Sequence, residues 1–247
     1  MLRTSLNNIL LITIGLICLA SCSKGYRIEG KSSVTSLDGK MLYLKALQEG
    51  DWIVVDSAEM VHGWFKMKGP VDSVRMVTLY MNEEGLMPLV LENGKIKVNI
   101  SNTQLVAEGT PLNDLLYDFI GRRNEMERAI NEAEREEARL VLDGVRLDDI
   151  HDRLQHEVDS MTQAMDAYVK NFITTNYENV LGTSIFMMMC SSLPYPVMTP
   201  DIEDILKTAP LAFKQNPLVK DYVSKAKENM KLIEENKRLQ ENMALNK

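Results

Sequence analysis

Hydrophobic and polar positions follow two different periods along this chain of 247 residues. Between about residues 26 and 110, short runs rich in Val, Ile, Leu and Tyr are separated by turn residues, a spacing typical of all-β domains. From residue 111 onward, apolar residues recur every three or four positions, which is typical of amphipathic helices. The pattern predicts an α+β protein, with an N-terminal antiparallel β-sandwich or partly open barrel followed by an α-helical region that contains a long helical hairpin.

The clearest turn signal in the first half is Asn93-Gly94, which suits a two-residue type I′ turn because both residues tolerate positive φ. It predicts a hairpin that joins a strand over 86–93 to a strand over 95–101, where Ile96, Val98 and Ile100 alternate with polar residues. Further turns are expected at Asp38-Gly39, at Glu49-Gly50 and over 82–85. Together these signals divide the region into about eight strands.

Helix boundaries in the second half are marked by capping residues before prolines. Thr110-Pro111 predicts a helix that runs to Asp143-Gly144, and a very regular apolar stripe predicts a second helix from Leu147 to Phe172. A buried helix is expected over 179–191, and two more helices should begin at Thr199-Pro200 and Asn216-Pro217. We expect the first two helices to pack as an antiparallel hairpin.

The C-terminal segment, 234–247, is almost entirely polar and is predicted to be a helical tail beyond a helical region over 111–233. Leu232, Asn236 and Leu239 have the spacing of a short coiled-coil seam, but fewer than three clean heptads support it. Self-association through this seam and a frayed, solvated end both remain open, and so does the formation of a homo-oligomer.

An apolar run over 9–19 precedes Leu19-Ala20-Ser21-Cys22, which resembles the cleavage box of bacterial lipoproteins. The run is too short to span a bilayer comfortably, so residues 1–21 are predicted to be a signal peptide that is removed. The resemblance implies that Cys22 becomes the first mature residue and carries diacylglycerol on its thiol and an acyl chain such as palmitate on its amine. The alternatives are a secretory signal with a coincidental cysteine and an uncleaved anchor.

The predicted location is the cell envelope, where the protein is expected to be attached to the membrane through lipidated Cys22. Some lipoproteins of this kind are sent to the cell surface when acidic residues follow the cysteine. Residues 23–26 contain no acidic pair, so the resemblance implies a protein that faces the periplasm, and the outer membrane is the expected location. An envelope protein is the expected macromolecular partner. Because the chain carries a net charge of −7, a nucleic-acid partner is not expected.

Three groups of residues resemble a known family: Asp56-Ser57-Ala58 with Gly63-Trp64-Phe65, the run 91–96, and the junction 106–114 with its Gly-Thr-x-x-Asn-Asp sequence. They are similar to lipoproteins of the domain of unknown function 4369 type. This module forms the N-terminal region of Bacteroides-type thioredoxin-like (TlpA/AhpC-like) thiol-disulfide oxidoreductase lipoproteins. The chain departs from those proteins because it has no thioredoxin pattern and no Cys-x-x-Cys, so their redox chemistry is not carried over.

Candidate chemistry is sparse, and no catalytic residue, cofactor or metal is predicted. One cluster has metal-ligand residue types, but its histidines are five positions apart, which suits a solvated helix face better than a metal site. It consists of Asp148, Asp149, His151, Asp152 and His156. Cys190 ends an apolar run and is expected to be an inert buried thiol. His62 and Trp64 are placed on the outward face of a predicted strand and form the one possible ligand patch. The alternative is that they are ordinary exposed residues at the rim of the sheet.

These observations predict a non-enzymatic, lipid-anchored envelope lipoprotein that binds a partner protein or a small ligand. A first alternative is an accessory protein that docks onto a separate thioredoxin-like oxidoreductase while lacking the redox motif itself. A second alternative is a hydrolase with its site between the β and helical parts.

Overall fold

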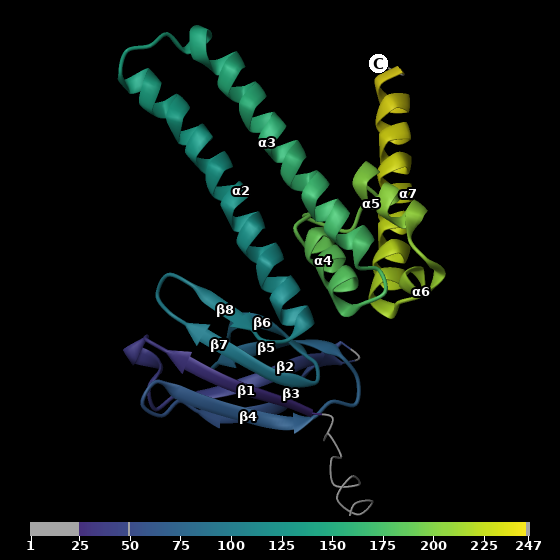
Figure 1. The fold of residues 1–247 in the computed structure, drawn as a ribbon. Coiled ribbons are helices and arrows are strands. Elements are labelled where there is room, and N and C mark those ends of the chain that lie inside the picture. Colours follow the sequence, from purple (N-terminus) through teal and green to yellow (C-terminus); the bar gives the residue numbers. More distant parts are fainter. Residues whose placement is uncertain (1–24, 49, 246–247) are drawn as a thin grey trace, which may run out of the picture. The chain divides into compact units, whose positions relative to one another are not determined.

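The computed structural model describes residues 25–48 and 50–245, so the predicted signal peptide and Cys22 lie outside the described residues. The chain divides into two compact units, one ending at Thr110 and the other beginning at Pro111 (Figure 1). The first unit is built from strands and the second from helices, as the two hydrophobic periods predict. Each unit is described by itself.

The first unit consists of two four-stranded sheets that form an open, sandwich-like arrangement. The first sheet has the order β4 (Trp64–Pro70), β1 (Gly25–Ser32), β7 (Gly94–Ile100), β8 (Leu105–Glu108). The second has the order β3 (Asp51–Glu59), β2 (Met41–Gln48), β5 (Arg75–Met81), β6 (Glu84–Leu91). A short 3-10 turn, η1 (Thr35–Leu37), lies between β1 and β2. The predicted sandwich is therefore confirmed.

The hairpin predicted around Asn93-Gly94 is wrong. Strand β6 pairs with β5 in one sheet, whereas β7 pairs with β1 and β8 in the other, so the turn carries the chain between sheets. Gly94 has a φ of 132°, while Asn93 is not among the residues with positive φ, so the type I′ geometry is absent. The pairing of β1 with β7 is also parallel, unlike every other strand pair among the described residues.

The hairpin expected over 82–85 is confirmed as the connection between β5 and β6. Met81 and Glu84 are register partners, and Asn82 in the loop has a φ of 55°. Asn is one of the few residues other than glycine that adopt this left-handed conformation readily. Gly39 and Gly50, at the two other expected turns, also have positive φ.

The core of the sandwich is formed by side chains at alternate strand positions, as the period of two requires. Phe65 on β4 lies opposite Gly30 on β1 and is only 2% exposed. A polar link also joins the two sheets, because the Tyr26 hydroxyl on β1 donates to Asp56 Oδ2 on β3 at 2.7 Å. Burial of this phenol and its carboxylate partner raise the pKa of Tyr26. Fully buried aliphatic side chains fill the remaining space: Ile28, Leu42, Leu44, Leu79, Leu89 and Ile96.

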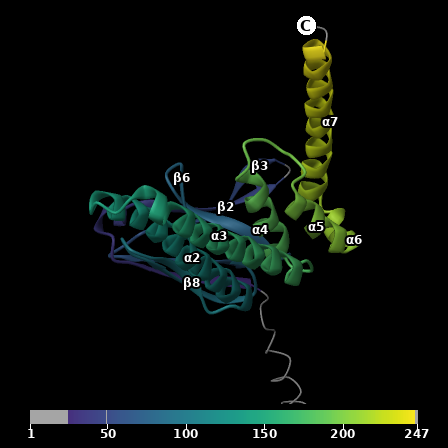
Figure 2. The same cartoon turned by 90° about the horizontal axis from the view of Figure 1, so that it is seen from above.

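The second unit begins with the helical hairpin that the sequence predicts. Helices α2 (Pro111–Leu142) and α3 (Leu147–Thr175) run side by side in both views (Figures 1 and 2). The turn between them contains Gly144, whose φ is 86°. Phe119 of α2 is held between two aromatic rings of α3, with ring-centroid distances of 4.2 Å to Phe172 and 5.5 Å to Tyr168. Such contacts add to the apolar burial that pairs the helices.

Four more helices follow: α4 (Val180–Ser191), α5 (Pro200–Thr208), α6 (Leu211–Lys214) and α7 (Pro217–Leu245). The predicted capping residues Thr199 and Asn216 are confirmed, since their side-chain oxygens accept from backbone amides of the first turns of α5 and α7. Asn179, which was not predicted as a cap, does the same for α4. The short helix α6 was not predicted, because four residues are too few to show a period. None of the helices within the described part of the chain is long and apolar enough to cross a membrane.

Helix α7 has two differing halves. Val219, Tyr222 and Ala226 in its first half are buried, whereas every residue over 231–243 is exposed. In both views the second half extends away from α4, α5 and α6 (Figures 1 and 2). Leu232, Leu239 and Met243 are more than half exposed there, at 52%, 59% and 62%.

Candidate functional site

A pocket of about 430 Å³ opens in the second unit between α5, α6, α7 and the loop before α5. This volume is within the range of roughly 300–1,000 Å³ that small-molecule sites occupy. Its apolar lining is aliphatic: Met198, Leu206, Val219 and Val223. Its charged lining consists of one carboxylate and four amines: Glu203, Lys207, Lys214, Lys220 and Lys227. The pocket therefore combines an apolar wall with a basic rim.

Helical periodicity explains why these residues meet. Glu203, Leu206 and Lys207 are spaced by three and four positions, so they lie on one face of α5. Lys220, Val223 and Lys227 are spaced in the same way along α7. The long lysine stems extend the apolar lining while their ammonium groups stay in water.

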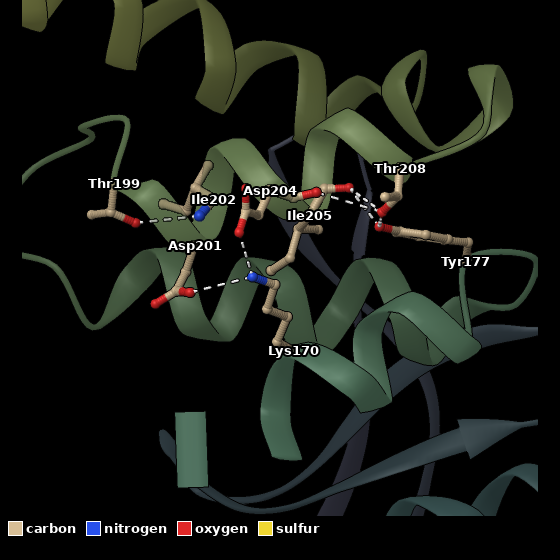
Figure 3. Close-up of polar contacts among 8 residues, drawn as sticks. All are labelled: Lys170, Tyr177, Thr199, Asp201, Ile202, Asp204, Ile205 and Thr208. Carbon is tan, nitrogen blue, oxygen red and sulfur yellow. Dashed lines mark hydrogen bonds and ion pairs between the residues drawn. The ribbon is translucent and has the colours of Figure 1, made fainter. Parts of the chain in front are cut away.

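Helix α5 is fixed in place by its opposite face, where a lysine from α3 bridges two aspartates (Figure 3). Lys170 Nζ lies 2.7 Å from Asp204 Oδ2 and 3.6 Å from Asp201 Oδ1. The hydrogen bond from Lys170 lowers the pKa of Asp204, and the same hydrogen bond raises the pKa of Lys170. The ammonium group of Lys170 and the carboxylate of Asp204 thus each favour the charged form of the other near neutral pH.

Tyr177, in the turn between α3 and α4, holds the C-terminal end of the same helix (Figure 3). Its hydroxyl lies 2.5 Å from the Ile205 carbonyl oxygen, to which it donates, and 3.0 Å from Thr208 Oγ1. Its ring also packs edge-on against Phe213 of α6, with 4.8 Å between ring centroids. One side chain thereby ties α5 and α6, two walls of the pocket, to the body of the unit.

The loop that carries Met198 is tied to α7 by two side chains. The Tyr222 hydroxyl donates to the Val197 carbonyl oxygen at 2.9 Å, and the Val197 amide donates back to the hydroxyl at 3.3 Å. Asn229 Nδ2 donates to the Pro196 carbonyl oxygen at 2.9 Å. The walls of the pocket are therefore held by hydrogen bonds that do not involve its lining, which favours a pre-formed site.

The electrostatic character of the pocket differs from that of the whole chain. The chain has a net charge of −7, yet four of the five charged residues that line the pocket are lysines. Within the described residues, none of these four lysines lies within 4 Å of a carboxylate. Their charges are available to an incoming anion.

The predicted ligand patch lies in the other unit. Trp64 is 54% exposed at the start of β4, with Lys31 Nζ 5.6 Å from the centre of its ring. His62 is exposed, but it does not lie on a strand as expected, because it forms a turn with Gly63 in which both φ angles are positive, 52° and 74°. The two side chains are neighbours at a solvated turn, and neither lines the pocket of the helical unit.

The residues of the candidate metal cluster begin α3. His156 and Asp152 are exposed, and the side chains of Asp148 and Asp149 are outside the described set. Among the side chains that the structure describes, no three His, Cys, Asp or Glu residues are arranged to hold a metal ion.

Cys190 is buried at the end of α4, with 2% of its surface exposed. Burial raises the pKa of its thiol to about 12, although the Tyr222 hydroxyl beside it acts in the opposite direction. Because the thiolate is the reactive form, a thiol with this pKa is a poor nucleophile near neutral pH.

The β unit is similar to one known family. Residues 26–116 match the family model of a domain of unknown function, DUF4369. The DUF4369 match covers the strands from Tyr26 of β1 to the end of β8 and the first residues of α2. The pocket between α5 and α7 lies outside it. No curated protein and no solved structure matches the chain.

Sequence reasoning missed the pocket. The spacing of apolar residues in the last helix predicts only that Val219 and Val223 pack against the rest of the unit; Val219 is buried as this implies, and both residues also line the pocket. The available signal was the recurrence of lysine at intervals of six or seven residues, at positions 207, 214, 220 and 227. That spacing alone cannot indicate a pocket, because it also suits a solvated helix face.

Proposed function

We propose that this protein is a non-enzymatic envelope lipoprotein, anchored through Cys22 to the outer membrane on its periplasmic side, that binds a small ligand in the pocket between α5 and α7. The observation that carries the ligand-binding role is the pocket itself, with its aliphatic wall and four lysines. The anchoring role is supported by the resemblance of the segment before Cys22 to a lipoprotein cleavage box.

Binding, not catalysis, is favoured by the chemistry of the lining. A catalytic site needs a nucleophile or a general base within hydrogen-bond reach of the reacting atom. The pocket offers aliphatic groups, one exposed carboxylate and exposed lysines that no buried environment activates. Such a set can hold and orient a molecule, but it supplies no evident acid-base pair.

Replacing Val223 by tryptophan should abolish ligand retention, because the ring would occupy the space between α5 and α7. The measurement is native mass spectrometry of the full-length protein purified from envelopes, which should show a bound small molecule on the wild type and on a control variant with an intact pocket, but not on Val223→Trp. Leu218→Trp is the matched control, since Leu218 lies on the same helix, is 45% exposed and does not line the pocket. Equal occupancy in wild type and Val223→Trp, or no bound molecule in any of the three proteins, would contradict the proposal.

A second candidate role is docking onto a separate thioredoxin-like lipoprotein, and the match of residues 26–116 to the DUF4369 family favours it. The docking surface would be edge strand β3, where Trp52, Ile53 and Val54 are 53%, 37% and 56% exposed. An unpaired edge with exposed apolar side chains can accept a partner strand.

Crosslinking in intact cells tests this second role. Wild-type protein should fractionate with membranes and capture a thioredoxin-like protein, whereas Cys22→Ala should become soluble and lose the capture. Replacing Val54 by lysine on the edge strand should lose the capture while anchoring is retained. Capture that survives Val54→Lys, or a Cys22→Ala variant that still fractionates with membranes, would count against docking through β3 and against lipid anchoring, respectively.

A further inference from the structure

We infer that the pocket between α5 and α7 takes a single-chain amphiphile, a molecule with one aliphatic chain and one anionic head group. This inference rests on the proposed ligand-binding function and names the chemical class of its ligand. Three features of the pocket carry it: the nature of its apolar wall, the arrangement of its charges and its rigid construction.

The apolar wall suits an aliphatic chain. Its members are Met198, Leu206, Val219 and Val223, and no aromatic ring lines it on which a flat ligand would stack. Methionine adapts its shape to irregular partners, and branched aliphatic side chains pack well against methylene groups. Val219 is fully buried, while Leu206, Val223 and Met198 are half-buried. Filling the pocket with a chain would remove this remaining apolar surface from water.

The charges define the head group. Lysines come from every helix that lines the pocket: Lys207 from α5, Lys214 from α6, and Lys220 and Lys227 from α7. None of them forms an ion pair within 4 Å in the described part of the chain, although Lys207 also acts electrostatically on Asp204. An ammonium group binds carboxylate or phosphate oxygens as a point charge and does not require one fixed geometry. An anion is therefore favoured over a neutral or cationic head.

Glu203 limits the number of anionic groups. It is the single carboxylate in the lining and lies one helical turn before Lys207 on the same face of α5. A second negative group on the ligand would meet this carboxylate, at an electrostatic cost. One acidic head at the lysines with an uncharged chain along the aliphatic wall satisfies both observations.

The walls of the pocket are held in fixed positions, which favours a specific binding site over a flexible apolar surface. Lys170 and Tyr177 hold α5, and Tyr222 and Asn229 hold the loop of Met198, all through groups that a ligand need not displace. A site whose walls are already in place loses less entropy when it binds its ligand.

Photoaffinity labelling of the full-length protein in envelope membranes tests the inference. Three probes share a dodecyl chain with a diazirine at its end and differ in the head group: a carboxylate, a phosphate monoester and an alcohol. The carboxylate probe represents a free fatty acid and the phosphate probe represents a lipid phosphate. The probe that labels the pocket more strongly therefore shows which of these two ligands the pocket prefers. Labelled peptides are mapped by mass spectrometry, and the expected sites lie on α5 and α7.

At least one anionic probe should label the pocket about tenfold more than the alcohol, since a charge-assisted contact contributes a factor of this order to affinity. In the Lys220→Gln/Lys227→Gln variant its labelling should fall to the level of the alcohol. The matched control is Lys231→Gln/Lys237→Gln, which removes the same charge from the exposed half of α7 and should leave labelling unchanged. Competition with excess unmodified dodecanoate should reduce the signal.

Two different results would overturn different statements. If the alcohol labels the pocket as strongly as both anions, and Val223→Trp abolishes all labelling, the ligand class is wrong while the binding function stands. If labelling is indifferent to Val223→Trp, the pocket is not a ligand site, and both the inference and the proposed function fail.

Discussion

Replacing Gly182 by alanine is expected to destabilise the helical unit by about 3 kcal/mol, near the upper end of the usual cost of overpacking. Gly182 lies in the first turn of α4, and a Cβ there would come 2.2 Å from the carbonyl oxygen of Asn176. The obstacle is backbone that cannot rotate away, because the Asn176 side chain is bonded to the Phe172 carbonyl oxygen at 2.9 Å and to Asn179 at 2.7 Å. The measurement is urea unfolding followed by circular dichroism at 222 nm, which reports the helices.

Gly121→Ala provides the matched control for that experiment. Gly121 is also a helical glycine, but a Cβ at this position of α2 meets nothing within 4 Å. The same substitution should therefore stabilise the protein by up to about 1 kcal/mol through helix propensity. An unchanged or raised stability of Gly182→Ala would show that the turn between α3 and α4 can move, contrary to the contacts around Asn176.

The second large effect is expected in the sandwich, where Gly30→Ala should cost about 2 kcal/mol. The ring of Phe65 lies directly over Gly30, so an added Cβ would come 1.8 Å from Phe65 Cε1, and the ring must leave its place in a filled core. Both tryptophans of the chain, Trp52 and Trp64, belong to this unit, so tryptophan fluorescence during urea unfolding reports it selectively.

A double-mutant cycle with Phe65→Leu separates this clash from a general loss of stability. The smaller side chain should make room for the new methyl group, so the double variant should lose less stability than the two single variants together. A coupling of about 1 kcal/mol is expected for side chains in direct contact. Costs that simply add would show that the ring of Phe65 is not the obstacle.

The helices could be predicted closely from the sequence because their signals are local. Thr199 and Asn216 each cap a helix whose first residue is proline, and a capping hydrogen bond depends only on neighbours in the chain. The stripe of α3 recurs over many turns, so a single irregularity does not obscure it. The predicted helical hairpin follows from two such helices joined by the short turn at Gly144.

Strand pairing could not be predicted in the same way. The alternation of Ile96, Val98 and Ile100 shows that β7 has one buried face, but not which strand lies beside it. The Asn93-Gly94 sequence favours a hairpin between β6 and β7. In the structure β7 instead pairs with β1, an arrangement in which the apolar faces of the two sheets are buried against each other. Here packing between distant segments outweighs the local turn preference.

The pocket could not be predicted because it depends on three helices at once. Each lysine, taken alone, is an ordinary exposed residue on an amphipathic helix. Their convergence requires the positions of α5 and α6 against α7, which Tyr177 and Phe213 help to fix through contacts that span the α3–α4 turn and α6. His62 and Trp64, in contrast, could be predicted as a ligand patch because their closeness is visible in the sequence itself.

The parallel pair in the first sheet has a consequence for the order of folding. In the second sheet, β2 pairs with β3 and β5 pairs with β6, and the members of each pair are consecutive in the chain. The third pair, β2 with β5, is separated by only β3 and β4, so this sheet can form early. Strand β1 must instead wait for β7, whose partner residues lie roughly 70 positions further along the chain, and closing such a long loop is slow. The N-terminal strand of the sandwich therefore remains without its central partner until almost the whole unit has been synthesised, and in this interval its unpaired edge is exposed to mispairing.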